Sequence, residues 1–550
     1  MAQLTGSEIL AKALRNEGVD DLFFLMGGPM LLAEASCIKE GIRPIDARHE
    51  QAAAFMAQAY SRLLNKPSVC MAASGPGVTN LITGIANAYV DCVPVVAIGG
   101  SSPFKAYGQQ VFQEIDQLAM MKPCTKWAER VYSLKRIPEM VNVAFQKAMA
   151  GKPGPVYLDM PGDILYETID EADVDWSISG RKLPRARPHA SPELVDETIA
   201  ALSKAERPVI VTGGGILWSD ASPELREFVD KAGVPFYTTP QGRGVIPDDH
   251  PLSFMTVRSA AFRDADLIMI VGTRMNYIIG HAAPPRFNAD ATIVRIDIDE
   301  DEISTSPRQI DIGIVGDAKA VLGQINAKLY GNVTTDSYAG WRKRLGDDEA
   351  AKRSRPGGNS VSDATPIHPL RLCEEVKNFM DRDAILVVDG QEILNYGRQS
   401  MPTFTPGHRM NSGPFGTMGV GLPFGLGAKV AKPDTQVIVV HGDGSFGLNA
   451  MELDTAVRHG IAVLVVISLN GGWTADPEKD KPGRDLGFTR YDKMGEALGC
   501  YGEYVEEPGE IRGALERAQA EVNKGRIAVV NIKTDDTARA TTQAFSSYTT

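Results

Sequence analysis

An aspartate and an asparagine stand at the two ends of the stretch "GDGSFGLNAMELDTAVRHGIAVLVVISLNGGW", residues 442–473. Asp443 follows the apolar run "QVIVV", and Asn470 follows the apolar run "AVLVVISL". Each run predicts a buried strand, and the segment between them predicts a helix. Because the carboxyl ends of parallel strands open on one edge of a sheet, the two side chains can meet there.

The residue types at this edge indicate a divalent cation and a phosphate. Mg²⁺ prefers hard oxygen ligands, which a carboxylate, an amide oxygen and a backbone carbonyl provide. Backbone N–H groups in a Gly-rich turn after a strand can hold phosphate oxygens. Taken singly, Gly-Asp-Gly and Asn-Gly-Gly are ordinary turn signals. The two together, separated by one helix–strand crossover, are far more specific.

The whole stretch resembles the signature of thiamine-diphosphate-dependent enzymes, which has Gly-Asp-Gly at one end and Asn at the other, at about this separation. The resemblance implies a magnesium ion held by Asp443, Asn470 and the carbonyl of Gly472, which anchors the diphosphate of the cofactor. It further implies cofactor contacts from the turns around this site, namely Gln391, Glu392, Gly442, Gly444, Ser445, Trp473 and Thr474.

Two features in the first third of the chain fit the same family. Glu50, in "DARHEQAAAF", matches the glutamate that binds the aminopyrimidine ring and promotes loss of the proton from C2 of the thiazolium. Without the resemblance it would read as a solvated or capping acid at a helix start. The turn "SGPGVTN", residues 74–80, resembles the segment beside the pyrimidine ring, with Pro76 and Asn80 as its contacts.

A Gly-rich stretch in the last third, "NSGPFGTMGVGLPFGLGAK", fits the family as well. Its glycines let the backbone approach a cofactor closely. The resemblance implies that Met418 wedges the cofactor into its bent shape and that the backbone at Gly416 and Met418 binds the pyrimidine. A methionine at such a position would otherwise be a core residue that fills an irregular gap.

Other stretches resemble particular members of the family. "FQEID", with Phe112 and Gln113, is similar to the active-site loop of acetolactate synthases and 2-hydroxyacyl-CoA lyases, and Asp476 falls where other members place a catalytic acid. "TVRSAAFRDADLIMIVGTRMNYIIG", "PQGRGVIPDDHP" and "DGQEILNYGRQSM" resemble the acyl-CoA enzymes, and the flavin-binding pattern of acetolactate synthase is missing. Lyases and decarboxylases of this family usually have a tyrosine at or close to the position of Trp473. The larger indole implies a pocket of different shape, so branched or ketone-forming 2-hydroxyacyl groups are also expected as substrates.

The resemblance therefore implies a 2-hydroxyacyl-CoA lyase that forms formyl-CoA and an aldehyde or ketone reversibly. The alternatives are an oxalyl-CoA decarboxylase, a flavin-free carboligase like acetolactate synthase, or a cofactor-binding protein that has lost catalysis. Glu50 counts against the last, because an inactive protein needs no proton-relay acid. In this family the site forms between the first domain of one subunit and the last domain of another, so a homodimer or homotetramer is implied.

Coenzyme A carries several negative charges, so a net acidic chain needs a local basic groove to bind it. Arg258 and Arg409 are the expected contacts, with Arg274 as a further candidate. In the acyl-CoA relatives a central-domain site can hold ADP as an effector. Here the residues that could form such a site are Gly213, Gly214, Arg274 and Asp297.

Strand and helix signals alternate along most of the chain, as in "DDLFFLMGGP" and "RHEQAAAFMAQAYSRLL". This alternation predicts an α/β fold of three domains, each with a doubly wound parallel sheet. The expected domains are a pyrimidine-binding domain (1–185), a central nucleotide- or CoA-binding domain (190–335), and a diphosphate- and magnesium-binding domain (365–550). The polar stretches 170–195 and 342–369 are expected linkers, and the hydroxyl-rich tail 534–550 an expected lid.

The bulk composition narrows the class of protein. The 550 residues carry a formal net charge of −12, which argues against a nucleic-acid partner. The six cysteines have no zinc-like or CxxC spacing, so reduced thiols in a cytoplasmic protein are expected. The N-terminal segment predicts a capped amphipathic helix in place of a signal peptide, and no apolar run reaches the length of a membrane span.

Overall fold

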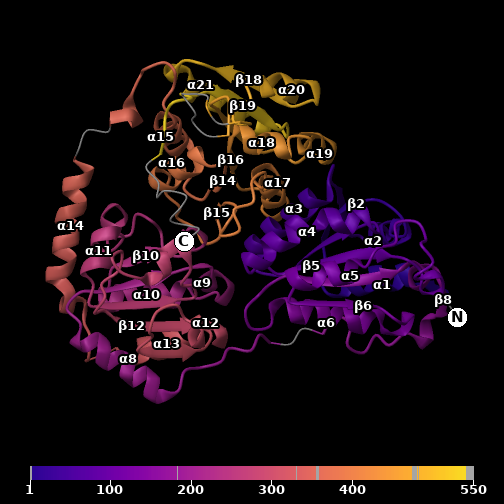
Figure 1. Cartoon of the computed structure of the whole chain (residues 1–550), viewed down its shortest axis with the longest axis horizontal. Helices are drawn as coiled ribbons and strands as arrows, with labels where there is room; N and C mark the ends of the chain where they lie inside the picture. Colours follow the sequence, from indigo (N-terminus) through magenta and orange to yellow (C-terminus); the bar gives the residue numbers. More distant parts are fainter. Residues whose placement is uncertain are drawn as a thin grey trace.

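The computed structural model describes residues 3–181, 184–329, 331–354, 358–473, 480 and 482–540. Three parallel β-sheets, each flanked by helices, form three lobes that follow one another along the chain (Figure 1). The predicted fold class, three α/β domains with doubly wound parallel sheets, is confirmed. Among the described residues, no helix combines the length and the apolar character needed to cross a membrane.

The first sheet has the strand order β3-β2-β4-β5-β7-β6, with all neighbours parallel. Its central strands are buried at every residue, as expected for strands covered on both faces. A short antiparallel pair, β1 and β8, lies apart from it. The elements are β1 (Gln3–Thr5), α1 (Gly6–Asn16), β2 (Asp21–Leu25), α2 (Leu31–Lys39), β3 (Arg43–Asp46), α3 (Glu50–Leu64), β4 (Ser68–Ala72), α4 (Pro76–Val90), β5 (Val95–Ser101), α5 (Gln117–Met121), β6 (Trp127–Arg130), α6 (Ile137–Met149), β7 (Val156–Pro161), α7 (Gly162–Tyr166) and β8 (Thr168–Asp170).

The second sheet has the order β10-β9-β11-β12-β13, again all parallel. Its strands and the helices around them form a hydrophobic core that is separate from those of the other lobes. The elements are α8 (Pro192–Lys204), β9 (Pro208–Thr212), α9 (Gly214–Ser219), α10 (Ser222–Ala232), β10 (Phe236–Thr238), α11 (Arg258–Asp264), β11 (Leu267–Val271), β12 (Thr292–Asp297), α12 (Glu300–Ser304), β13 (Ile312–Val315), α13 (Ala318–Lys328) and α14 (Ala339–Arg353).

The third sheet has the order β15-β14-β16-β17-β19-β18, also all parallel. Its elements are α15 (Pro369–Phe379), β14 (Ile385–Asp389), α16 (Glu392–Ser400), β15 (Arg409–Met410), α17 (Gly421–Ala431), β16 (Val437–Gly442), α18 (Asp443–Leu448), α19 (Glu452–His459), β17 (Leu464–Leu469), α20 (Tyr491–Ala497), β18 (Tyr501–Val505), α21 (Ile511–Asn523) and β19 (Ala528–Lys533).

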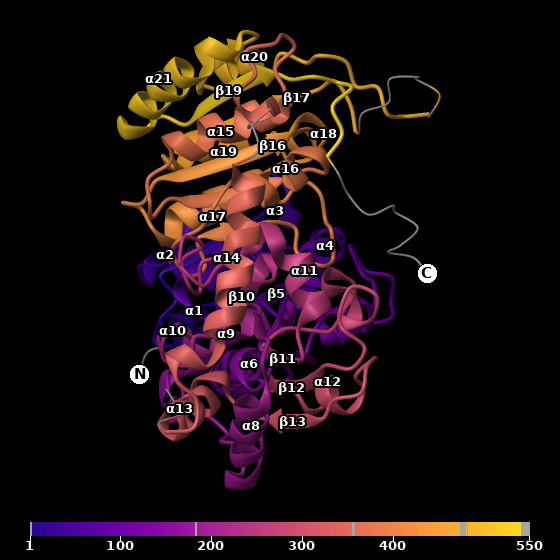
Figure 2. The same cartoon turned by 90° about the vertical axis from the view of Figure 1, so that its left-hand side faces the viewer.

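Part of the expected second linker is a helix. α14 runs along one side of the central lobe toward the third lobe (Figures 1 and 2). Its sequence is mostly charged, but Trp341 and Leu345 are 4% and 1% exposed against the central core. Two apolar residues four positions apart suffice to dock one helical face. The high charge of the stretch concealed this pattern in the sequence.

The first and third lobes share one hydrophobic core, in which α3 packs on α17. Phe55 and Phe424 meet edge to face, with ring centroids 5.9 Å apart. Gly427 allows the two helices to approach, since a Cβ atom there would lie 2.2 Å from the carbonyl oxygen of Met56. Glu50 is the first residue of α3, so this contact fixes its helix against the lobe that contains the third sheet.

Candidate active site

The structure brings Asp443 and Asn470 together at the carboxyl edge of the third sheet. β16 and β17 are parallel neighbours with Gly442 opposite Ser468, so the residues that follow them face each other. Asp443 is 2% exposed. Its Oδ1 accepts the N–H of Gly444 at 2.9 Å, and its Oδ2 accepts the N–H of Gly471 at 2.8 Å.

As the Asn470 amide is oriented in the structure, three oxygen atoms converge at this point. The side-chain oxygen of Asn470 faces the carbonyl oxygen of Gly472 and Oδ1 of Asp443, at 3.0 Å from each. Turning the amide over would place its nitrogen there as a donor to both, and amide orientation is an assignment. The oxygen orientation fits a cation, because octahedral Mg²⁺ with bonds of about 2.1 Å holds adjacent oxygens about 3.0 Å apart.

Among the residues that the structure describes, the buried carboxyl of Asp443 lacks a positively charged partner that would keep it ionised. Burial raises the pKa of this carboxyl to about 7, while the backbone N–H groups of Gly444, Gly471 and Gly472 lower it. A divalent cation at the three oxygens would favour the ionised carboxylate. The donor set of Asp443, Asn470 and Gly472 therefore fits Mg²⁺, as the resemblance implies.

A cavity of about 410 Å³, part of it open to solvent, lies beside these oxygens. Most of the predicted cofactor contacts line it: Gln391, Glu392, Met418, Gly442, Asp443, Gly444, Ser445, Asn470, Gly472 and Trp473. Gly416, at φ +74°, is exposed and is not among the lining residues. Thr474 and Asp476 lie outside the described residues.

Sequence reasoning missed several lining residues. One signal could have found Gly390, since "VVDGQE" repeats the pattern of a strand followed by Asp-Gly that marks Asp443. Glu392 accepts the N–H of Ala540 at 2.9 Å, which brings the tail to the cavity. Residues 541–550 of the predicted lid lie outside the described residues. The lining residues not predicted are Pro369, Gly390, Ile393, Ser468, Asp535 and Ala538.

The indole of Trp473 packs on the start of α18. A Cβ atom on Gly444 would lie 2.7 Å from Cε3 of Trp473, so only glycine fits there. The backbone N–H of Trp473 donates to the carbonyl oxygen of Arg484 at 2.9 Å, which holds the residue in place. The ring thus covers the turn predicted to bind the diphosphate, and its influence on substrate shape stays a prediction.

The first-domain residues form a second group at the edge of the first sheet. Glu50 is 7% exposed, and its Oε2 accepts the Nδ2–H of Asn80 at 2.9 Å. The Ser74 hydroxyl donates to Oε1 of Gln113 at 2.8 Å, which ties "FQEID" to the turn that carries Pro76. Phe112 next to it is 87% exposed.

This group does not line the cavity at Asp443. Of the residues that the structure describes, those lining that cavity all fall between 369 and 538. The pyrimidine contacts predicted in the first domain and the predicted diphosphate contacts therefore lie in separate places within one chain.

A larger cavity of about 1030 Å³, also partly open to solvent, lies where the central lobe meets the other two. Three of the predicted nucleotide residues, Gly214, Arg274 and Asp297, line it. Gly213 does not, and its backbone packs against Thr273. Burial raises the pKa of Asp297 to about 6, although the backbone N–H of Asp299 lowers it.

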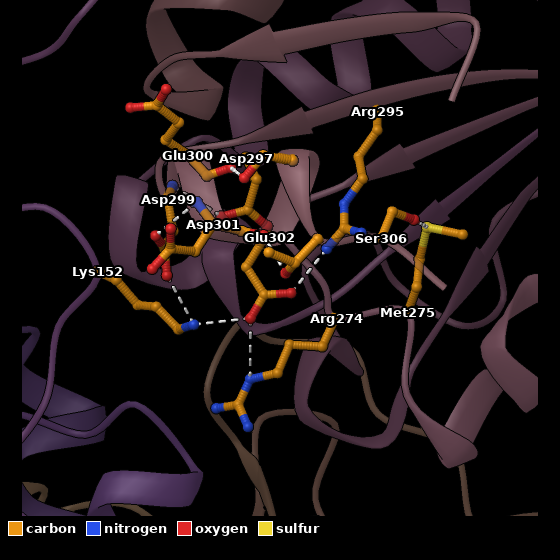
Figure 3. A network of polar contacts seen from close by, with 12 residues as sticks. Lys152, Arg274, Met275, Arg295, Asp297, Asp299, Glu300, Asp301, Glu302 and Ser306 are labelled. Atoms are coloured by element: carbon orange, nitrogen blue, oxygen red, sulfur yellow. Dashed lines mark hydrogen bonds and ion pairs between the residues drawn. The ribbon is translucent and has the colours of Figure 1, made fainter. Parts of the chain in front are cut away.

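A charged network beside this cavity joins the first and central lobes (Figure 3). Glu302 lies 2.7 Å from Nζ of Lys152, 2.8 Å from Arg295 and 3.8 Å from Arg274. Lys152 also pairs with Asp299 at 2.9 Å. Arg274 donates to Sγ of Cys92 at 2.7 Å. Arg274 is therefore held by protein groups from two lobes.

The two arginines predicted to bind coenzyme A have different surroundings. Arg409 is 1% exposed, and its Nη1 donates to the carbonyl oxygen of Met401 at 3.2 Å. A side chain enclosed in this way does not face a groove, so the structure does not support a coenzyme A contact for Arg409. Arg258 is half-buried at the start of α11, and its contact with coenzyme A stays a prediction.

Comparison with known proteins adds three family matches and several relatives. Residues 4–120 match the N-terminal thiamine pyrophosphate binding domain of thiamine pyrophosphate enzymes, 195–325 their central domain, and 394–532 their C-terminal thiamine pyrophosphate binding domain. An acetolactate synthase large subunit of Mycobacterium tuberculosis is 35% identical over 536 residues, covering 96% of this chain and 95% of the relative.

The names of two further relatives include coenzyme A thioesters as substrates. A 2-hydroxyacyl-CoA lyase of Arabidopsis thaliana is 32% identical over 562 residues, covering 98% of this chain and 96% of the relative. An oxalyl-CoA decarboxylase of Escherichia coli is 31% identical over 544 residues, covering 97% and 95%. The three named activities differ, so these similarities alone do not choose among them.

The three-oxygen geometry predicts opposite behaviour for two variants of Asn470. With thiamine diphosphate and Mg²⁺ at 100 times their dissociation constant, the wild type should gain about 2.7 kcal/mol of stability. Asn470→Ala should lose most of this gain, because it removes a ligand. Asn470→Asp should keep it, yet be destabilised without metal because two carboxylates then face each other. Thermal unfolding with and without the ligands measures all three. If Asn470 instead donates to Asp443, Asn470→Asp will be destabilised equally in both conditions.

Proposed function

The chain belongs to the family of thiamine pyrophosphate enzymes, and from this premise we propose that it cleaves a 2-hydroxyacyl-CoA thioester. In the proposed reaction the bond between C1 and C2 of the acyl group breaks. C1 leaves as formyl-CoA, and C2 leaves as the carbonyl carbon of an aldehyde or ketone. The proton lost by the 2-hydroxyl group balances the hydrogen gained by the formyl carbon, and the reverse ligation uses the same groups.

Each chemical task of the proposed reaction falls to a residue of this chain. Bound thiamine diphosphate supplies a nucleophilic carbon and accepts the electron pair of the broken bond. Asp443, Asn470 and the carbonyl of Gly472 would hold the Mg²⁺ that anchors it. Glu50 would bind the pyrimidine and relay the proton, since it is a carboxylate in a nearly dry position beside Asn80. Gln113, Phe112 and Asp476 remain the proposed substrate-side groups.

The observation that supports a coenzyme A substrate is the positive charge around Arg258. Burial, together with the neighbouring Arg286, Arg243 and Arg398, lowers the pKa of Arg258 to about 10. Of these, Arg243 pairs with Asp248. No hydrogen bond or ion pair to the Arg258 guanidinium is found among the described residues. Because a guanidinium stays charged, this cluster favours a polyanionic ligand such as coenzyme A.

α16 connects this arginine cluster with the cofactor cavity. Its first residue, Glu392, lines the cavity at Asp443, while Arg398 lies near Arg258. Six residues of helix span about 9 Å. α16 thus has the cofactor cavity at one end and the arginine cluster near the other, which supports a substrate with a thioester at one end and phosphate groups at the other.

The second candidate is a flavin-free carboligase like acetolactate synthase. It is favoured by the 35% identity to an acetolactate synthase large subunit, which exceeds the 32% to a 2-hydroxyacyl-CoA lyase. A carboligase that joins small 2-keto acids has no phosphate groups to bind, so it would leave the charge at Arg258 without a ligand. An oxalyl-CoA decarboxylase would use the same arginines, and it differs only in the acyl group.

Three further proposals concern assembly, effectors and location. We propose a homodimer or homotetramer, because Glu50 and the Asp443 cavity lie apart in one chain. The large central cavity, lined by Gly214, Arg274 and Asp297, has the size to hold an ADP-like effector. A cytoplasmic location suits the six cysteines, all of which are free thiols.

The proposed reaction is tested by supplying three substrates separately: a 2-hydroxyacyl-CoA, oxalyl-CoA and pyruvate. We expect formyl-CoA and an aldehyde or ketone from the first, identified by mass spectrometry. Including a branched 2-hydroxyacyl-CoA tests the substrate range. Turnover of pyruvate alone would reject the lyase in favour of the carboligase. Turnover of oxalyl-CoA alone would establish the decarboxylase.

Arg258→Ala should raise KM for the acyl-CoA substrate about tenfold, because one hydrogen bond to a charged group contributes about 1.5 kcal/mol or more. Its kcat should change little, since Arg258 lies away from the thioester end. Arg263→Ala is the matched control on the same helix, with a 62% exposed side chain. Equal KM values for the two variants would remove Arg258 from the binding site.

Assembly is tested by combining two inactive variants, Glu50→Gln and Asp443→Asn. Each alone should lose activity by a factor of about 10² or more. If a site takes Glu50 from one subunit and Asp443 from another, a mixed dimer contains one intact site. Co-expression should then restore about a quarter of the wild-type activity for random pairing. Activity that stays absent in co-purified mixed oligomers would place both residues of a site in one chain.

A further inference from the structure

A buried carboxylate next to the cofactor cavity has no role so far. Asp389 is the last residue of β14 and is 0% exposed. Its Oδ1 accepts the N–H of Gly390 at 2.7 Å, and its Oδ2 accepts the N–H of Gly421 at 2.9 Å. The side chain itself is not among the residues that line the cavity.

Its two hydrogen bonds reach two chain segments that both contribute residues to the cavity lining. Gly390 leads into Gln391 and Glu392, which line the cavity. Gly421 begins α17 three residues after Met418, which also lines it. These two segments lie about thirty residues apart in the chain, and one carboxylate joins them.

The backbone around Asp389 is packed as closely as glycine allows. A Cβ atom on Gly421 would lie 2.3 Å from Cε1 of His441 and 2.9 Å from Cβ of Asp389. Gly390 has φ +122°, a conformation that other residues rarely adopt. The turn that carries Met418 is also held from its other side, where Nδ2 of Asn449 donates to the carbonyl oxygen of Gly419 at 2.7 Å.

The charge of Asp389 is balanced by backbone N–H groups. Burial raises its pKa to about 6, while the N–H groups of Gly421, Gly390, Gly419 and Val420 lower it. The nearest basic side chain is His441, with Nδ1 3.7 Å away, and burial lowers the pKa of His441 to about 3. A neutral imidazole cannot neutralise the carboxylate, so the position of these N–H groups stabilises its ionised form.

We infer that Asp389 is a positioning residue that holds the Met418 turn and the Gln391 turn at the separation the folded cofactor needs. Through Met418 it would act on the bent shape of the cofactor, and through Gln391 and Glu392 on a second part of the cavity lining. The inference rests on the thiamine-diphosphate cofactor and not on the acyl group, so it stands or falls separately from the proposed substrate.

Asp389→Asn tests this role, since it keeps the volume and loses one acceptor. A buried N–H then lacks its partner, and the two turns are free to separate. We expect the dissociation constant for thiamine diphosphate with Mg²⁺, measured by calorimetry, to rise about tenfold or more. At saturating cofactor, exchange of the thiazolium C2 hydrogen with deuterium, followed by NMR after acid quench, should slow by at least about tenfold.

Asp492→Asn is the matched control, because Asp492 is a buried carboxylate of the same lobe that bonds Arg490 and Asn531 away from the cavity. It should lower thermal stability without changing cofactor affinity or C2 exchange. The inference is overturned if Asp389→Asn exchanges at the wild-type rate once saturated, or if Asp492→Asn shows the same defects.

If Asp389→Asn does not fold, Asn449→Ala provides an independent test of the Met418 turn. This variant removes the donor to Gly419 and leaves Gly390 and the Gln391 turn in place. The C2 hydrogen exchange of the saturated protein should slow here too, by a smaller factor. An unchanged exchange rate would show that the position of the Met418 turn does not matter, which would also reject the role of Asp389.

Discussion

Three oxygen atoms that share no hydrogen meet where β16 and β17 end, and the rest of the site is arranged around them. They belong to a carboxylate, an amide and a carbonyl that come from two neighbouring parallel strands. The parallel register brings them within 3.0 Å, and glycines on either side let backbone N–H groups hold the carboxylate. With Asn470 in this orientation the three acceptors repel one another unless a cation lies between them, so the proposed magnesium site depends on the strand register.

The sequence predicted the parts of this arrangement that are local in the chain. Apolar runs ending in Gly-Asp-Gly or Asn-Gly-Gly identified two strand ends, and their parallel pairing followed from the alternation of strands and helices. Short or polar elements were missed. The many charged residues of α14 hide its two apolar contacts, and β15 has only two residues, which form a strand because they pair with β14. The bond of Asp389 to Gly421 and the burial of Arg409 depend on contacts between distant segments, which no short pattern contains.

Family resemblance and geometry carry different parts of the functional argument. The matched domains establish the cofactor family over most of the chain, and the relatives divide among three activities. Choosing among those activities falls to the residues that meet the substrate. The proposal of a thioester with phosphate groups, in place of a small 2-keto acid, rests on the positive charge around Arg258 and on the helix α16 that runs from there to the cavity.

The distribution of hydrophobic cores has a consequence for how such enzymes diversify. The first and third lobes share one core along α3 and α17, to which the central lobe adds Trp218, beside a further core in each; the core of the central sheet is separate. The first and third lobes should therefore unfold as one cooperative unit, and the central lobe as another. A lineage can then replace or reshape the central lobe, with its large cavity, while the pair of lobes that holds the cofactor stays intact.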